Sequence, residues 1–176
     1  MVAALGESLR TAAPRAGRTR VLAIDGRSGA GKTSLAAGLR RELAAPVVSL
    51  EDLYGGWDGL ENGIDLLVRA VLEPLAAGRT ARVPRYDWVA GKWAEPVALD
   101  PPEALIVEGV GAGARRAAVF ESLVVWVEAP LSVRRKRALD RDGDVFAPHW
   151  EQWAAQEDAM LARERTPERA AVVIRG

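Results

Sequence analysis

The sequence predicts a three-layer α/β fold with a five-stranded parallel sheet at its centre. Short apolar runs suited to buried strands alternate with helical patterns along the 176 residues, which is typical of parallel strands joined by right-handed helical crossovers. The first run, Val21–Asp25, leads straight into Gly26–Thr33, which reads Gly-Arg-Ser-Gly-Ala-Gly-Lys-Thr. A strand, a G-x-x-x-x-G-K-[ST] loop and a helix in this order indicate a phosphate-binding loop, so we expect the fold of the P-loop nucleoside triphosphate hydrolases.

The spacing within this loop has a mechanical reason. Its glycines let the backbone curl so that successive N–H groups point inward, and the N-terminus of the following helix adds positive potential. Lys32 can reach the outer phosphates, and the Thr33 hydroxyl can hold a magnesium ion. We therefore expect ATP and Mg²⁺ as cofactors, with the nucleotide bound by Gly26, Arg27, Ser28, Gly29, Ala30, Gly31, Lys32 and Thr33.

The next part of the chain reads as a helix, a strand, a loop, a second helix and a hairpin. Leu35, Leu39 and Leu43 recur every fourth residue, as on the buried face of a helix. The apolar run Val47–Leu50 is followed by an acidic, aromatic and glycine-rich segment typical of a loop. In chain order the pattern predicts a strand at 47–50, a loop at 51–63, a helix over 64–77 and a β-hairpin over 81–99.

The rest of the chain supplies the remaining strands. Ala104–Val107 and Leu123–Val127 are continuous apolar runs, as expected of strands covered on both faces. A basic helix over Leu131–Arg141 follows, then a longer helix over Pro148–Arg165 and a last strand over Ala171–Ile174. The length suits a single domain over 1–176, with a hairpin at about 79–99 and a lid at about 131–145.

Composition narrows the classes of partner. The formal net charge is zero, so no global field draws the protein to nucleic acid or to a membrane surface, and we expect neither as a partner. The absence of cysteine fits a reducing, cytoplasmic location. The first 20 residues lack the apolar stretch of a signal peptide and suit a short helix or a frayed terminus. Assembly into a homo-oligomer stays open.

Acidic side chains follow the predicted strands at the edge where parallel sheets bind ligands. Glu51, Asp52 and Tyr54 come after the second strand, and Glu108 comes after the third. Phosphoryl transfer needs a base for the incoming hydroxyl, and either Glu51 or Asp52 could accept that proton. Glu108 could hold the metal through water or orient the acceptor. The alternative for each acid is a helix cap or a solvated side chain.

The helix over 131–141 carries a second positive cluster. Arg134, Arg137 and Arg141 stand at i, i+3 and i+7, on one helical face. One interpretation is a solvated basic face. The other is a lid that brings guanidinium groups onto the transferred phosphate, as an arginine finger does.

Tryptophans are frequent near the expected acceptor pocket. Trp57 and Trp88 fall in the segments that would flank it. Trp150 and Trp153 are assigned to packing of the lid helix, and His149, the single histidine, to the surface at the start of that helix.

From Val21 to its end the chain resembles the uridine–cytidine kinase group of P-loop kinases, to which phosphoribulokinase and pantothenate kinase are related. Glu51-Asp52-Leu53-Tyr54 resembles the group's Asp-x-Phe-Tyr element, whose Asp is the catalytic base, and Trp57-Asp58 resembles its Phe-Asp element, whose Asp holds ribose hydroxyls. Val83–Trp88 is similar to Ile-Pro-x-Tyr-Asp-Phe, whose Tyr lines the nucleoside pocket, and Val107–Gly109 to Phe-Glu-Gly. Pro130-Leu131, Arg137, Arg141 and Asp142 fall in register with its lid helix.

The resemblance implies an ATP-dependent phosphotransferase that acts on a hydroxyl of a small molecule of the nucleoside type. We therefore expect chemistry from Lys32, Glu51 or Asp52, Arg137 and Arg141, metal binding by Thr33 and Glu108, and acceptor binding by Tyr54, Asp58, Tyr86, Glu108 and Arg134. Of these roles, the resemblance itself implies those of Glu51, Asp58 and Tyr86. Gly91 and Trp93 replace a nucleobase-contacting His and an Arg, so an apolar or differently shaped acceptor could replace the pyrimidine. The competing interpretation is an ATP-binding regulator or degenerate kinase without transfer activity. A GTPase is disfavoured because no Asn-Lys-x-Asp is present.

Overall fold

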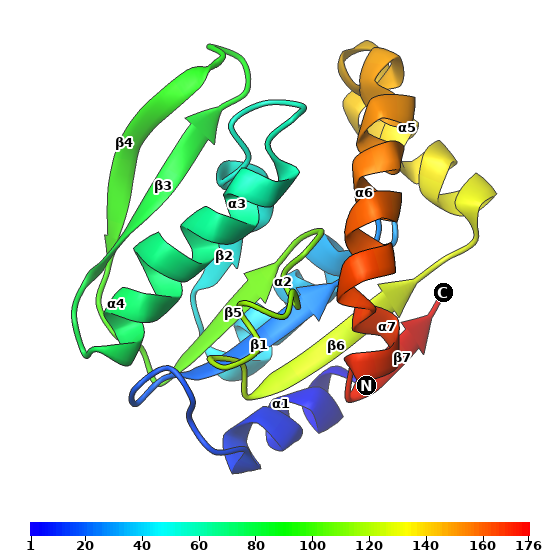
Figure 1. The fold of residues 1–176 in the computed structure, drawn as a ribbon. Helices are drawn as coiled ribbons and strands as arrows, with labels where there is room; N and C mark the ends of the chain where they lie inside the picture. Colours follow the sequence, from blue (N-terminus) through cyan, green and yellow to red (C-terminus); the bar gives the residue numbers. More distant parts are fainter.

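The computed structural model describes residues 1–176 and contains the predicted five-stranded parallel sheet (Figure 1). The strand order across the sheet is β2-β5-β1-β6-β7, and every neighbouring pair is parallel. The strands are β1 (Arg20–Asp25), β2 (Val47–Ser49), β5 (Ala104–Glu108), β6 (Leu123–Glu128) and β7 (Val172–Arg175). The predicted fold class is therefore confirmed.

Two layers of helix cover the sheet because its central strand is apolar on both sides. Leu22 and Ile24 pack with α1 (Val2–Thr11) and α2 (Lys32–Leu43). The alternate residues of β1, Val21 and Ala23, join the larger core on the opposite face. The N-terminal segment is thus an ordered helix that closes one side of the core.

The opposite face is covered by one long helical rod. It begins as α3 (Leu60–Leu66), passes through a π-helical stretch (Leu67–Leu72) and ends as α4 (Glu73–Ala76). The loop expected at 51–63 is shorter than predicted because the rod begins at Leu60, and because Leu50–Asp52 forms a 3₁₀ turn. The Ser49 hydroxyl caps this turn by accepting the N–H of Glu51 at 3.3 Å.

The predicted hairpin forms a separate two-stranded sheet, β3 (Ala81–Asp87) and β4 (Lys92–Leu99). Its register shifts between Val83 and Arg85, on either side of a proline that has no amide hydrogen to donate. Gly91 lies in the turn with φ of +62°. In Figure 1 the hairpin stands beside the α3–α4 rod, away from the main sheet.

The lid rises above the sheet on the side opposite the hairpin (Figure 1). It consists of α5 (Leu131–Phe146), a 3₁₀ turn (Ala147–His149) and α6 (Trp150–Glu164). α5 continues five residues beyond the predicted Arg141, and its path bends at Gly143, where φ is 52° and ψ is −133°. Because the 3₁₀ turn occupies Ala147–His149, α6 begins at Trp150, two residues later than expected.

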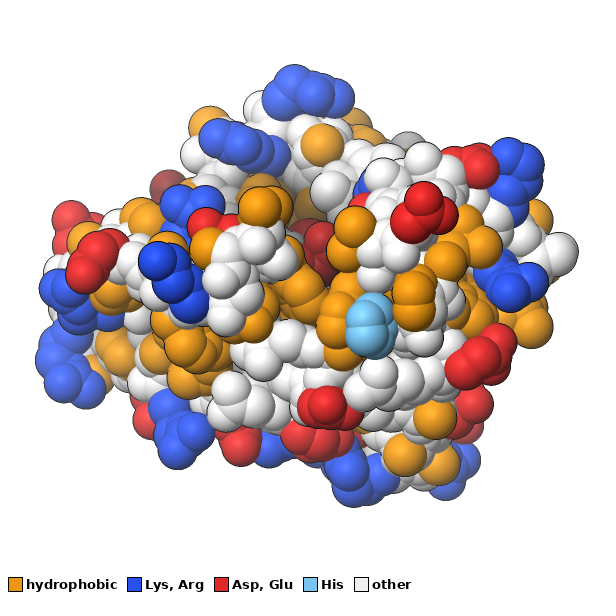
Figure 2. All heavy atoms as spheres, turned by 90° about the horizontal axis from the view of Figure 1, so that it is seen from above, with side chains coloured by type: hydrophobic (Ala, Val, Ile, Leu, Met, Phe, Trp, Pro, Cys, Tyr) orange, Lys and Arg blue, Asp and Glu red, His pale blue; other side chains and the backbone are white.

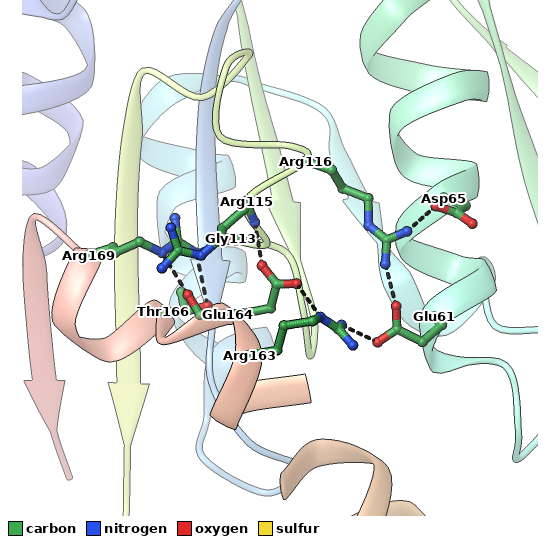
Figure 3. A network of polar contacts seen from close by, with 9 residues as sticks. All are labelled: Glu61, Asp65, Gly113, Arg115, Arg116, Arg163, Glu164, Thr166 and Arg169. Atoms are coloured by element: carbon green, nitrogen blue, oxygen red, sulfur yellow. Dashed lines mark hydrogen bonds and ion pairs between the residues drawn. The ribbon is translucent and has the colours of Figure 1, made fainter. Parts of the chain in front are cut away.

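A network of polar contacts anchors the base of the lid (Figure 3). Glu164 accepts the backbone N–H of Arg115 at 2.7 Å, and Arg163 pairs with both Glu164 and Glu61. Arg169, on α7 (Thr166–Arg169), donates to the carbonyl of Gly113 at 2.6 Å. These contacts join α6 and α7 to the loop after β5 and to α3. No helix of the molecule is both long enough and apolar enough to span a bilayer.

Candidate active site

The phosphate-binding loop, Gly26–Thr33, connects the carboxyl end of β1 to α2. Gly26 and Gly29 have φ of +153° and +76°, and a Cβ on either residue would overlap the backbone carbonyl of Val127 or of Arg134. Only glycine fits these two positions. Lys32 is 8% exposed, and its Nζ lies 3.1 Å from the carbonyl oxygen of Arg27. The curled backbone and the enclosed lysine have the form that the motif predicted.

The lid supports this loop from outside. Ser28 donates its backbone N–H to Glu157 Oε1 at 2.8 Å, and its carbonyl accepts from Arg134 Nη1 at 3.3 Å. Arg27 Nη1 lies 3.8 Å from Glu157 Oε2. Arg134 of α5 and Glu157 of α6 therefore contact both each other and the backbone of the loop.

Arg134, for which acceptor binding was predicted, hydrogen-bonds the loop and does not line the cavity described below. Its guanidinium also donates to the carbonyl of Ala129 at 3.1 Å, and burial lowers its pKa, with Glu157 opposing that shift. The prediction rested on helical spacing alone, which cannot tell which arginine of a basic face turns into the core.

Glu108 and Thr33 meet beside Lys32, as expected of a metal site. The Thr33 hydroxyl lies 3.4 Å from Glu108 Oε2, and the Ser49 hydroxyl donates to Glu108 Oε1 at 2.8 Å. Burial raises the pKa of Glu108, while Lys32 and the Ser49 hydrogen bond oppose that shift. No three acidic or histidine side chains cluster as a metal cage. One hydroxyl and one carboxylate suit Mg²⁺, which usually takes one or two protein oxygens and completes its shell with phosphates and water.

Asp25, at the end of β1, is a structural acid that the sequence analysis missed. Its buried carboxylate accepts three backbone N–H groups, from Gly26 at 2.7 Å, Gly111 at 2.9 Å and Gly113 at 3.0 Å. Burial raises its pKa, and the three amides and Lys32 oppose that shift. Asp25 thereby fixes the phosphate loop against the loop after β5.

Next to the phosphate loop lies a cavity of about 350 Å³. Figure 2 shows the face hollowed here, with hydrophobic side chains gathered around the hollow near the single histidine and acidic atoms deep within it. The lining residues come from the phosphate loop, the segment after β2, the hairpin, the loop after β5 and the lid: Ser28, Lys32, Glu51, Tyr54, Trp57, Trp88, Gly109, Val110, Arg141, Asp142, Val145, Phe146 and Trp153.

Of the two candidate bases, only Glu51 lines this cavity. Its Oε1 lies 3.1 Å from Arg141 Nη2. Asp52 does not line the cavity, and burial raises the pKa of Asp52, while the charge of Arg85 on the hairpin opposes that shift. The geometry thus separates two acids that the sequence left equivalent.

The two lid arginines differ in their surroundings. Arg141 lines the cavity and is held by Asp142 at 2.7 Å as well as by Glu51, and these partners raise its pKa. Arg137 is exposed, and its Nη1 lies 3.9 Å from where a Cβ on Gly31 would stand. Both therefore lie close to the phosphate loop or to the cavity.

The acceptor residues implied by the resemblance are only partly brought together. The ring of Tyr54 lines the cavity, but its hydroxyl donates to the carbonyl of Val110 at 2.7 Å. Asp58 and Tyr86 lie outside the lining. Asp58 accepts a hydrogen bond from Gln152 at 2.6 Å, and Tyr86 packs against the rings of Trp88 and Trp93.

Several residues in or beside the candidate site escaped the sequence analysis. Trp153 lines the cavity as well as packing the lid, and Phe146 lies parallel to Trp57 at 5.2 Å between ring centroids. His149 stacks on Trp57 at 4.5 Å and is not a free surface residue. Glu157 could have been noticed, because it stands four residues after Trp153 on the buried face of α6.

No protein-family profile matches the chain. A cytidylate kinase of Methanococcoides burtonii is 29% identical over 144 residues, which cover 81% of this chain and 75% of that protein. A possible uridine kinase from Bacillus stearothermophilus has a TM-score of 0.70 at 23% identity, covering 98% of this chain and 96% of the other. A protein described as a fructose transport system kinase, from a Silicibacter species, has a TM-score of 0.65 at 18% identity, covering 98% of each chain.

These comparisons define the class: the chain has the fold of the P-loop kinases, with the phosphate loop in its expected place. In sequence it is similar to a cytidylate kinase, and in fold it is similar to a possible uridine kinase.

Proposed function

We propose that this protein is an ATP-dependent phosphotransferase that transfers the γ-phosphate to a hydroxyl of a small, nucleoside-like molecule. The observation that carries the proposal is the convergence of Lys32, Glu51 and Arg141 on one cavity, which begins at the phosphate loop and continues into an aromatic chamber. The name of one similar structure, a possible uridine kinase, supports a nucleoside acceptor, and the name of the similar cytidylate kinase supports an acceptor that contains a nucleoside.

The loop and its neighbours would hold the nucleotide. Backbone N–H groups of Gly26–Thr33 and the Lys32 ammonium would bind the β- and γ-phosphates. Thr33 and Glu108 would hold Mg²⁺, directly or through water. When bound, the ion neutralises charge on the β- and γ-oxygens.

Glu51 would take the proton of the acceptor hydroxyl. As the O–H bond breaks, the acceptor oxygen forms a bond to the γ-phosphorus, the bond from phosphorus to the β–γ bridging oxygen breaks, and ADP leaves. Arg141, which now contacts Glu51 at 3.1 Å, and Arg137 would turn to the transferred phosphoryl group and stabilise its charge.

Acceptor-dependent release of ADP over a panel of nucleosides tests this proposal. Lys32→Ala and Glu51→Gln should both abolish turnover, but Glu51→Gln should still bind ATP. If no member of the panel raises ADP release above the rate with ATP alone, nucleoside kinase activity is excluded.

A second candidate function is an ATP-binding regulator that does not transfer phosphate. It is favoured by Glu51, which stands where the resembled kinases carry Asp and whose carboxylate is paired with Arg141. In that case the wild-type protein would release no acceptor-dependent ADP, Glu51→Gln would still bind ATP, and Lys32→Ala would abolish ATP binding.

A further inference from the structure

Several polar groups around the aromatic chamber are already hydrogen-bonded within the protein, whereas the buried indole nitrogen of Trp153 has no partner. Tyr54 donates its hydroxyl to the carbonyl of Val110 at 2.7 Å, and Trp88 donates its indole N–H to the carbonyl of Glu51 at 2.9 Å. The backbone N–H of Gly109 donates to Ile24 at 3.2 Å. A ligand that hydrogen-bonded to any of these three groups would first have to break a hydrogen bond within the protein.

The charged groups of the chamber are also engaged with one another. Arg141 donates to both carboxylate oxygens of Asp142, at 2.8 and 2.7 Å, and to Glu51 at 3.1 Å. The proposed reaction uses Arg141 and Glu51 at the hydroxyl and the phosphoryl group. Neither is then available to a second polar group at the far end of the acceptor.

The remaining walls are apolar and largely aromatic. Trp57 and Phe146 lie parallel, with planes 10° apart, and Tyr54 meets Trp153 edge-on at 4.9 Å. Val145 is 67% exposed at the edge of the cavity. Trp57 already stacks on Phe146 and on His149, so these walls gain free energy from a flat apolar body chiefly through burial of its surface. The polar residues implied for ring and ribose, Tyr86 and Asp58, stand outside the lining.

We infer that the preferred acceptor presents its hydroxyl to Glu51 and an apolar aromatic ring to the chamber of Tyr54, Trp57, Trp88, Phe146 and Trp153. The inference rests on the proposed phosphotransfer and names its substrate class. The ring is selected chiefly by shape and apolar contact, because Trp153 Nε1 is the one buried side-chain donor of the chamber without a partner. A nucleobase carries several donors and acceptors on its edge, so it would enter this chamber with most of that edge unpaired, at a cost in affinity.

Pairs of ribosides that share the ribose hydroxyls but differ in the polarity of the ring test the ring preference alone. We would compare uridine with phenyl riboside and inosine with indolyl riboside, using ADP release for kcat/KM and calorimetry with a non-hydrolysable ATP analogue for affinity. The apolar member of each pair should be preferred at least about tenfold in both measurements. Equal or better use and binding of uridine and inosine would overturn the inference while leaving the phosphotransfer intact.

The calorimetric affinities distinguish failure of the proposed phosphotransfer from failure of the inferred ring preference. If no riboside is phosphorylated but the apolar members still bind at least about tenfold more tightly, the proposed transfer fails and the ring preference holds. If the members of each pair bind equally, the ring preference fails whatever the turnover.

A substitution at the edge of the chamber gives an independent test. Val145→Asn places a free amide beside the ring. The ratio of kcat/KM for the apolar riboside to kcat/KM for its polar partner should fall at least about threefold in this variant. Val89→Asn makes the same change on a fully exposed hairpin residue outside the lining, and it should leave the preference unchanged. The same preference in both variants would show that the ring does not lie against Val145, and would overturn the assignment.

Discussion

Glu157 Oε1 lies 2.8 Å from the backbone nitrogen of Ser28 and accepts its N–H. Glu157 belongs to lid helix α6, whereas Ser28 belongs to the phosphate-binding loop. The same carboxylate, 1% exposed, stands within 4.0 Å of the guanidinium groups of Arg27 and Arg134. One buried acid therefore links the position of the lid to the shape of the nucleotide site.

Removal of this acid should weaken ATP binding. Glu157→Gln keeps an oxygen that can accept the Ser28 N–H but removes the charge beside Arg27 and Arg134. We expect its Kd for ATP, measured by calorimetry, to rise about three- to tenfold. Glu157→Ala leaves Arg134 buried without its acid, so its free energy of unfolding should fall by about 3–5 kcal/mol.

Glu151→Gln provides the control for these variants, because Glu151 is exposed on the same helix. Its ATP affinity and stability should match those of the wild-type protein. A Glu157→Gln protein with unchanged ATP affinity would show that the lid carboxylate does not shape the loop.

The sequence predicts the elements whose hydrophobic pattern agrees with their burial in the folded protein. The loop Gly26–Thr33 and the apolar strands were predicted because spacing and burial agree there. Glu157 and Asp25 were missed, because each acid is buried by contacts between segments far apart in the chain. The bend at Gly143 was missed because a single glycine within a helical pattern does not reveal its φ.

Gly143 should be required for the path of the lid. Its φ of 52° and ψ of −133° are unfavourable for any residue with a Cβ, although no atom lies near enough to clash with one. Gly143→Ala should lower the free energy of unfolding by roughly 1–2 kcal/mol. It should also lower kcat/KM by about ten- to a hundredfold, because Arg141 and Phe146 flank the bend.

Gly78→Ala separates the backbone cost from the effect on the lid. Gly78 has φ of +69° and open space around it, but it follows α4, away from the cavity. Chemical denaturation should give the two variants similar losses of stability. Only Gly143→Ala should lose activity, and an equal loss in both would argue against a special role for the bend.

The stability of the protein should depend on pH through Glu121. Both of its carboxylate oxygens are buried without a hydrogen-bond partner, and burial raises its pKa well above 4.5, with Asp25 adding to the shift. Below pH 4.5 the group is protonated in both the folded and the unfolded states. As the pH rises, the unfolded chain ionises first, so the contribution of Glu121 to stability is lost progressively until the folded pKa is passed.

Glu121→Gln removes this dependence. At pH 8 the variant should be more stable than the wild-type protein by ~1–3 kcal/mol, and at pH 4 the two should be alike. Urea denaturation at both pH values measures the difference. Glu73→Gln, an exchange on an exposed residue, should change neither value. A Glu121→Gln protein that is less stable than wild type at pH 8 would mean that the carboxylate has a partner in solution.

Ser49 should couple the expected metal site to the candidate base. Its hydroxyl donates to Glu108 Oε1 at 2.8 Å and accepts the backbone N–H of Glu51 at 3.3 Å. In Ser49→Ala the carboxylate of Glu108 loses its orienting donor, and partners of this kind change metal affinity by about 10–100-fold. The Mg²⁺ concentration for half-maximal ADP release should therefore rise at least about tenfold.

Ser49→Thr keeps the hydroxyl and should stay close to wild type in its Mg²⁺ requirement. Ser49 also holds the turn that carries Glu51, so Ser49→Ala should lower kcat even at saturating Mg²⁺. If the substitution weakened only Mg²⁺ binding, saturating Mg²⁺ would restore the wild-type kcat. A Ser49→Ala variant with the wild-type Mg²⁺ requirement would place the ion away from Glu108 and leave Thr33 as its protein ligand.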